Sequence, residues 1–163
     1  MTPEQKTWVL MTAAQAFNAL HIYPTMAACE AALESAYGTS QLARLGNNLF
    51  GTKQHLHPVC GTLSLPTKEF LDNEWVECTA DWIEYPNVPA CFADRMATLM
   101  RLRMAYPHYN SALMAATATQ YIREVSATWS TDPNRADKVL AIYNAVFPQT
   151  NTLQVQQAAN GEN

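Results

Sequence analysis

Apolar residues recur at helical spacing through the first third of the chain. The pattern predicts a helix over residues 4–20 that begins after Pro3, because proline is well tolerated in the first turn of a helix. The apolar positions of this helix are Trp8, Ala13, Phe17 and Leu20. A second, alanine-rich helix is expected over residues 24–35 with Gly38 as its stop, and a short one over residues 40–45.

The pattern changes between residues 61 and 85. β-Branched and aromatic residues stand on both sides of Asp72-Asn73, which is a turn signal, so this stretch predicts a β-hairpin. Helical spacing then returns and predicts helices over residues 90–105, 110–116, 119–128 and 134–147. The last of these has the clearest apolar face, made of Val139, Ile142, Tyr143, Val146 and Phe147.

These elements predict a mainly α fold. Residues 1–148 are expected to form one helical domain, with a small β-lobe at about 61–85 that forms one wall of a substrate cleft. Residues 149–163 are rich in Gln, Asn and Thr, which predicts a flexible C-terminal tail.

Composition narrows the classes of function. The chain has 163 residues, of which 48% are hydrophobic and 15% charged, so it is globular and not disordered. The net charge of −4 does not favour a nucleic-acid partner. The N-terminus lacks the features of a signal peptide, and no apolar stretch approaches the ~20 residues of a membrane helix. We therefore expect no nucleic-acid partner, no membrane segment and a monomer.

The most informative chemistry lies in two short segments. The first, Glu34-Ser35-Ala36-Tyr37-Gly38-Thr39-Ser40, places a carboxyl at the end of an apolar helix. Such surroundings favour the protonated form of a carboxyl, as general-acid catalysis requires. The second, Asn47-Asn48-Leu49-Phe50-Gly51-Thr52-Lys53, is a polar and aromatic turn typical of a sugar groove. Together they predict an enzyme that cleaves glycosidic bonds in a polysaccharide.

These two segments and Thr131-Asp132-Pro133 resemble the bacterial glucosaminidase family, glycoside hydrolase family 73, over residues 5–147. The resemblance implies a lysozyme-like helical fold and hydrolysis of the bond from N-acetylglucosamine to N-acetylmuramic acid (β-1,4) in peptidoglycan. It implies no cofactor and no metal. It also implies action on the cell wall, in the periplasm or outside the cell, after release or non-classical export.

The resemblance also implies roles for individual residues. Glu34 matches the general acid and Glu69, on the β-lobe, matches the second carboxylate, with Glu74, Glu77 and Asp81 as other candidates on the same lobe. Glu69 would act as the base for a water molecule, or the N-acetyl group of the substrate would attack instead. The expected substrate-binding residues are Tyr37, Asn47, Asn48, Phe50 and Trp129.

The chain departs from the family pattern at two positions. Trp129 stands where the family usually has a tyrosine, and Trp82 is followed by Ile83 where the family has a basic residue. These departures keep open a catalytically weak module that binds the cell wall. Within enzymes, a lytic transglycosylase or a muramidase on the same fold also stays open.

Each candidate residue also has a structural alternative. Glu34 could form a salt bridge, Asn47 and Asn48 could cap a turn, and Tyr37, Phe50 and Trp129 could belong to the core. We expect Asp132 and Pro133 to start the last helix.

The cysteines and histidines leave three further options open. Cys29 is expected to be buried, and a disulfide between Cys60 and Cys78 is conceivable. His55, His57 and Cys60 could contribute ligands to a zinc ion. A Cys–His hydrolase would need Cys60 or Cys91 beside His108. We favour the glycosidase over the last two.

Overall fold

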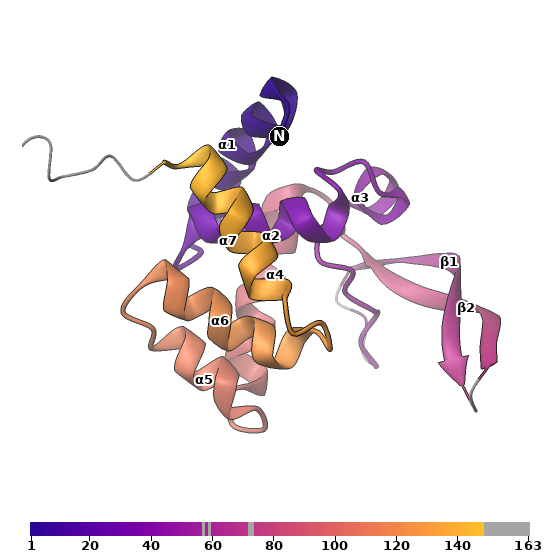
Figure 1. Cartoon of the computed structure of the whole chain (residues 1–163). Helices are drawn as coiled ribbons and strands as arrows, with labels where there is room; N and C mark the ends of the chain where they lie inside the picture. Colours follow the sequence, from indigo (N-terminus) through magenta and orange to yellow (C-terminus); the bar gives the residue numbers. More distant parts are fainter. Residues whose placement is uncertain (57, 59, 72–73, 149–163) are drawn as a thin grey trace, which may run out of the picture.

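A body of helices carries one projecting β-hairpin (Figure 1). The computed structural model describes residues 1–148 apart from 57, 59, 72 and 73, and leaves the side chains of residues 68–71 and 75 undescribed. In chain order the elements are α1 (Pro3–Asn18), α2 (Pro24–Ser35), α3 (Gln41–Gly46), β1 (Gly61–Leu71), β2 (Glu74–Glu84), α4 (Val88–Leu102), α5 (Pro107–Leu113), α6 (Ala118–Trp129) and α7 (Arg135–Val146). This order confirms the mainly α fold with a β-lobe. The predicted tail and the turn at Asp72-Asn73 lie outside the described residues.

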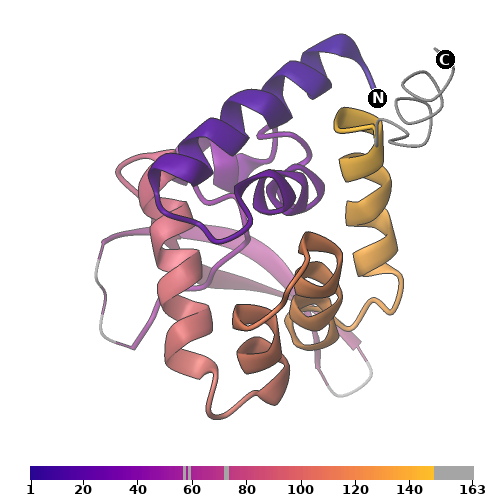
Figure 2. The same cartoon turned by 90° about the vertical axis from the view of Figure 1, so that its left-hand side faces the viewer.

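Helix α2 lies at the centre of the body, with α1, α4 and α7 around it (Figure 2). Residues 26–32 of α2 are all buried, and most of them are alanine. Their small side chains let neighbouring helices approach α2 from several sides. One core cluster takes Met26, Ala28, Cys29 and Ala32 from α2, and a second takes Ala27 and Ala31.

The helix starts follow local sequence signals. Thr2 caps α1 in a capping box with Gln5, and Pro3 stands in the first turn. Asn87 and Thr117 cap α4 and α6 by accepting hydrogen bonds from Ala90 N and Gln120 N. These caps explain why the predicted starts fall within three residues of the observed ones.

Two details of the predicted helices are wrong. Phe17 and Leu20 are 68% and 87% exposed, and α1 instead buries Val9, Thr12, Ala13 and Ala16. Helix α2 ends at Ser35, as predicted, but the residue that caps it is Ala36, with a left-handed φ of 50°, and not Gly38. By contrast, the predicted face of α7 is confirmed, since its five apolar residues are buried or packed against the first core cluster.

The hairpin is antiparallel and its register runs from Gly61 opposite Glu84 to Leu71 opposite Glu74. Residues 52–54 run beside the base of β2. Ile83 N donates to Thr52 O at 3.1 Å, and Gln54 N donates to Asp81 O at 2.8 Å. The base of the lobe is therefore tied to the loop that follows α3.

All four cysteines are free thiols, so the conceivable disulfide between Cys60 and Cys78 is not formed. The register explains why: Cys78 lies opposite Thr67, whereas Cys60 precedes Gly61. The two positions are separated by roughly 20 Å along the strand direction, far beyond disulfide reach. Cys29 is fully buried, as expected.

Among the helices described, none combines the length and apolar character needed to cross a bilayer.

Candidate active site

Glu34 occupies the last turn of α2, immediately before a left-handed turn. Ala36, Tyr37 and Gly38 all have positive φ, at 50°, 57° and 76°. Ser35 holds this turn, because its Oγ donates to Ala31 O at 2.6 Å and accepts from Gly38 N at 2.8 Å. The Glu34 side chain remains 27% exposed at this helix end.

The surroundings of Glu34 are not the purely apolar ones expected from the sequence. Arg135, at the start of α7, donates from Nε to Glu34 Oε1 at 2.7 Å. The Arg135 side chain is only 2% exposed, so this ion pair has one buried partner and one partly exposed partner. The salt bridge considered as an alternative role for Glu34 therefore exists. Glu34 Oε2 receives no hydrogen bond from the described residues.

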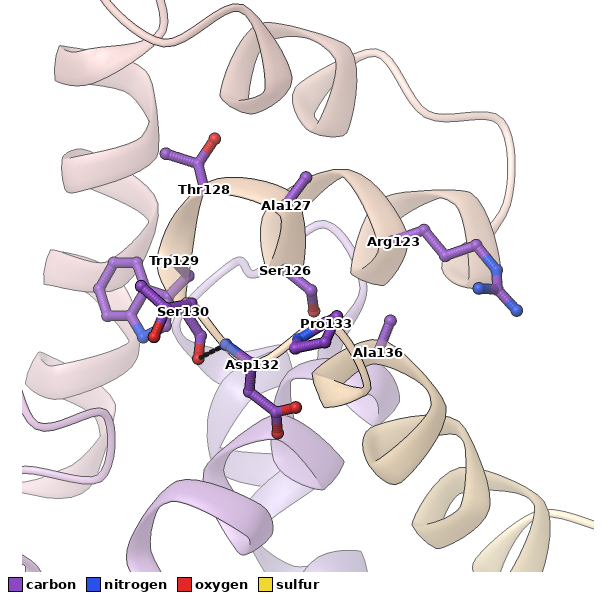
Figure 3. A pocket seen from close by; sticks show the side chains of 10 residues that line it. Arg123, Ser126, Ala127, Thr128, Trp129, Ser130, Asp132, Pro133 and Ala136 are labelled. Atoms are coloured by element: carbon purple, nitrogen blue, oxygen red, sulfur yellow. Dashed lines mark hydrogen bonds between the residues drawn. The ribbon is translucent and has the colours of Figure 1, made fainter.

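A pocket of about 700 Å³ opens beside the segment that joins α6 to α7 (Figure 3). Trp129, Ser130 and Asp132 line it together with Ser126 and Ala136. Within this loop Asp132 N donates to Ser130 Oγ at 3.1 Å. Glu34 is not among the lining residues, but Arg135 connects the two, since it contacts both Glu34 and the pocket-lining Ser126.

Trp129 is half-buried and stacks on a charged group. The guanidinium carbon of Arg95 lies 3.4 Å from the centroid of the Trp129 ring. The same ring packs against both core clusters. Trp129 thus has a packing role as well as a place in the pocket wall, and a sugar contact stays a prediction.

Asp132 lies at the start of α7, as expected, although Asn134 is the N-cap residue. Its Oδ1 accepts from Asn134 N at 2.9 Å and its Oδ2 pairs with Lys138 Nζ at 2.7 Å. The hydrogen bonds from Lys138 and Asn134 lower the pKa of the Asp132 carboxyl. These contacts fix the loop that carries the pocket wall.

Asn47 and Asn48 hold the loop after α3. Asn47 caps α3 in a left-handed conformation and donates from Nδ2 to Tyr85 O at 2.9 Å. Asn48 is 1% exposed; it donates to Thr52 O and Ile83 O and accepts from Thr52 N, each at 2.9 Å. Their turn-holding role is therefore observed, and contact with a substrate stays a prediction.

Phe50 and Tyr37 contribute packing as well. Phe50 is 2% exposed and packs edge-on against Phe92 at a centroid distance of 5.4 Å. Tyr37 is half-buried and meets Trp8 edge-on at 6.2 Å, and burial raises the pKa of its hydroxyl. The structure leaves Tyr37 the more accessible of the two.

The second catalytic carboxyl was expected on the β-lobe. Glu69 lies in β1 with its backbone opposite Val76, but its side chain is outside the described part. Of the other candidates, Glu74 and Glu77 are exposed, and Asp81 accepts a hydrogen bond from Ser64 Oγ at 2.5 Å. The role of Glu69 stays a prediction.

A basic residue does lie beside Trp82, although not next to it in the sequence. Lys53 forms a β-bridge with Trp82, and its Nζ lies 5.9 Å from the centroid of the indole ring. The loop after α3 therefore places a positive charge beside the aromatic of the lobe.

The alternative chemistries find little support. Within the described part of the chain, no group of three or more His, Cys, Asp or Glu side chains could hold a metal, and His57 lies outside that part. Burial raises the pKa of the Cys91 thiol to about 12, which disfavours a thiolate nucleophile. His108 pairs with Glu124 at 2.8 Å.

The charges buried behind Glu34 were not predicted from the sequence. Glu30 is fully buried in α2 and pairs with both Arg95 and Arg135. One signal was available: Glu30 precedes Glu34 by one helical turn in an otherwise apolar helix, and a buried carboxylate requires a charged partner. The identity of those partners depends on contacts over 65 and 105 residues of sequence.

Comparisons with known proteins agree with these features. The model of the glucosaminidase family, described as mannosyl-glycoprotein endo-beta-N-acetylglucosaminidase, matches residues 11–147. The peptidoglycan hydrolase FlgJ of Vibrio parahaemolyticus is 34% identical over 135 residues, which are 80% of this chain and 42% of that protein. A probable N-acetylmuramidase of Lactococcus lactis is 29% identical over 130 residues, which are 76% of this chain and 29% of that protein. The chain thus spans less than half the length of these relatives.

Solved structures share the fold. The catalytic domain of the autolysin Auto from Listeria monocytogenes superimposes with a TM-score of 0.73 at 22% identity, over 90% of this chain and 86% of that one. The truncated glycoside hydrolase domain of FlgJ from Salmonella typhimurium gives a TM-score of 0.69 at 24% identity, over 87% of this chain and 97% of that one. The helical body with its β-lobe is therefore the lysozyme-like fold of these catalytic domains.

Proposed function

Because the chain belongs to the glucosaminidase family, we propose that it hydrolyses the glycan strands of peptidoglycan between N-acetylglucosamine and N-acetylmuramic acid. The name of the Vibrio relative, a peptidoglycan hydrolase, supports this substrate. One observation carries the proposal: Glu34 stands partly exposed at the end of α2, with one carboxyl oxygen held by Arg135. The expected place of action is the cell wall.

Glu34 is the proposed general acid. Its Oε1 accepts the hydrogen bond from Arg135, which leaves Oε2 to carry the proton for the glycosidic oxygen. Proton transfer to that oxygen accompanies cleavage of its bond to the anomeric carbon, and a water oxygen then bonds to this carbon. Glu69 would accept the proton of that water, or the N-acetyl group of the substrate would attack first. The first route needs two carboxyl groups and water, and the second replaces the attack of water at the first step by that of the N-acetyl group.

A second bond specificity has its own support. The Lactococcus lactis relative carries the name N-acetylmuramidase, and a muramidase cuts the alternate bond of the same strand. Mass spectrometry of the sugar ends released from purified peptidoglycan separates the two. New reducing N-acetylglucosamine ends support the glucosaminidase. Reducing muramic acid ends indicate a muramidase, and anhydro ends indicate a lytic transglycosylase.

The same assay tests Glu34. We expect Glu34→Gln to abolish the release of sugar ends, because glutamine cannot donate the proton, while the circular dichroism spectrum is retained. A suitable control is Glu4→Gln, in the exposed first turn of α1, which should keep full activity. If Glu34→Gln retained most activity, Glu34 would not be the acid. Binding to sacculi without any released ends from the unmodified protein would indicate a binding module.

A further inference from the structure

Glu30 and Glu34 lie one turn apart on the same side of α2, and a single guanidinium contacts both. Arg135 donates from one terminal nitrogen to Glu30 Oε1 at 2.6 Å and from Nε to Glu34 Oε1 at 2.7 Å. Two carboxylates at this spacing would otherwise repel each other. Arg135 therefore links the buried carboxylate to the partly exposed one.

The Arg135 guanidinium has a separate acceptor for each of its three nitrogens. The third nitrogen donates to Ser126 Oγ at 2.9 Å, on α6. A planar group held at three points by two helices cannot rotate without breaking a hydrogen bond. Its direction, and with it the direction of the Glu34 carboxyl, is thus set by the core.

Glu30 anchors this arrangement from the centre of the body. Its Oε1 also accepts a hydrogen bond from Arg95, whose side chain is fully buried on α4. Burial by itself would raise the pKa of the Glu30 carboxyl, but the charges of Arg95 and Arg135 lower it below the ordinary value. Glu30 is therefore a fixed negative charge between two fixed positive charges.

The buried members of the network are one carboxylate, Glu30, and two guanidiniums, Arg95 and Arg135. Glu34 lies at the partly exposed end of this network and accepts a hydrogen bond from it through Oε1. Arg95 also stacks on Trp129 in the pocket wall, so the network reaches from that wall to Glu34.

We propose that Arg135 is a positioning residue that fixes the carboxyl of Glu34 toward the substrate, and that buried Glu30 anchors Arg135. This inference rests on the proposed function of Glu34. Under this proposal the buried ion network belongs to the site, although the buried Glu30 cannot itself reach a substrate.

The kinetic test compares Arg135→Met and Arg135→Lys with the unmodified protein on purified peptidoglycan. We expect Arg135→Met to lower kcat by about 10- to 100-fold with KM changed less than about threefold, because the acid is misplaced while the groove is intact. Arg135→Lys, which keeps the charge but cannot reach all three acceptors, should recover part of the loss. The matched control is Arg101→Met, because Arg101 lies on the exposed side of α4. We expect this variant to have an unchanged kcat. A folded Arg135→Met with kcat within about twofold of the unmodified protein overturns the proposal.

A second measurement does not depend on activity. Melting temperatures are compared for Glu34→Gln, Arg135→Met and the double variant. If Arg135 holds Glu34, the double variant should lose less than the sum of the two single losses, because each single change already removes one of the two charges of the ion pair. Additive losses overturn the positioning role. If the unmodified protein released no sugar ends, the proposed function would fail, and this cycle would still decide whether Arg135 holds Glu34.

Discussion

At the scale of single residues, burial sets the chemistry of the cysteines. Cys29 and Cys91 are fully buried, and burial raises the pKa of each thiol to about 12. Cys60 and Cys78 are only half-buried and carry no disulfide. Because the thiolate is the reactive form, the two pairs should differ strongly in reactivity.

We therefore expect iodoacetamide to modify Cys60 and Cys78 in the folded protein and to spare Cys29 and Cys91. Peptide mass spectrometry after a short incubation at neutral pH counts the modified thiols. The denatured protein is the control, and all four thiols should react there. Rapid modification of Cys91 in the folded state would contradict the structure.

The candidate site was predictable where the sequence carries local motifs. Glu34 could be singled out, since its place at a helix end follows from the apolar run before it and the turn after it. The hydrogen bonds of Asn48 could not be predicted in this way, because one acceptor, Ile83 O, is 35 residues away. Arg95 and Arg135 were missed for the same reason.

At the scale of elements, the left-handed turn after α2 places Glu34. Gly38 has a φ of 76°, and a Cβ at this position would lie 2.7 Å from Trp8 Nε1. The turn thus depends on glycine twice, for its backbone conformation and for its contact with α1.

Gly38→Ala should lower the free energy of unfolding more than Gly51→Ala does. Gly51 has a similar φ of 62°, but a Cβ there would meet nothing within 4 Å. Gly51→Ala should cost about 1–2 kcal/mol for the left-handed conformation alone. Gly38→Ala should cost about 1–3 kcal/mol more because Trp8 must move. Urea unfolding of both variants measures the difference. Equal losses of unfolding free energy would show that Trp8 can move aside without destabilising the protein.

Helix boundaries were predictable and helix faces less so. Pro3 and Pro24 act locally and stand in the first turns of α1 and α2. The starts of α4 and α6 fall within two residues of the predicted ones. Phe17 has the right spacing for a buried face, yet it is exposed because α2 packs closely on the alanine side of α1. Leu20 lies beyond the end of α1 at Asn18, with a left-handed φ of 59°. Which side of a helix is covered depends on its neighbours.

At the scale of the whole molecule, buried ionisable groups make stability depend on pH. His21 is 4% exposed, and burial lowers its pKa from 6.5 to about 4, with Glu30 opposing and Arg95 assisting this shift. The unfolded chain therefore binds a proton near pH 6.5 that the folded chain does not accept until about pH 4. Between these values the free energy of unfolding falls as the pH falls.

From this group alone we expect a loss of about 3 kcal/mol between pH 7 and pH 4. His21→Gln should flatten the dependence of the melting temperature on pH in this window. The control is Asn18→Gln, an exposed residue that does not titrate, and this variant should keep the original slope. An unchanged slope in His21→Gln would mean that His21 can be protonated in the folded protein.

By itself, the sequence determined the mainly α fold, the β-lobe, the family and the position of Glu34. These follow from periodicity, caps and short motifs, which act over a few residues. Only the tertiary structure decided what surrounds Glu34. The ion network of Glu30, Arg95 and Arg135 joins α2, α4 and α7, and no local pattern specifies which buried charges meet. The charged side chains around Glu34 are distant from it in sequence, because a buried charge is stabilised by whichever partner the fold brings to it.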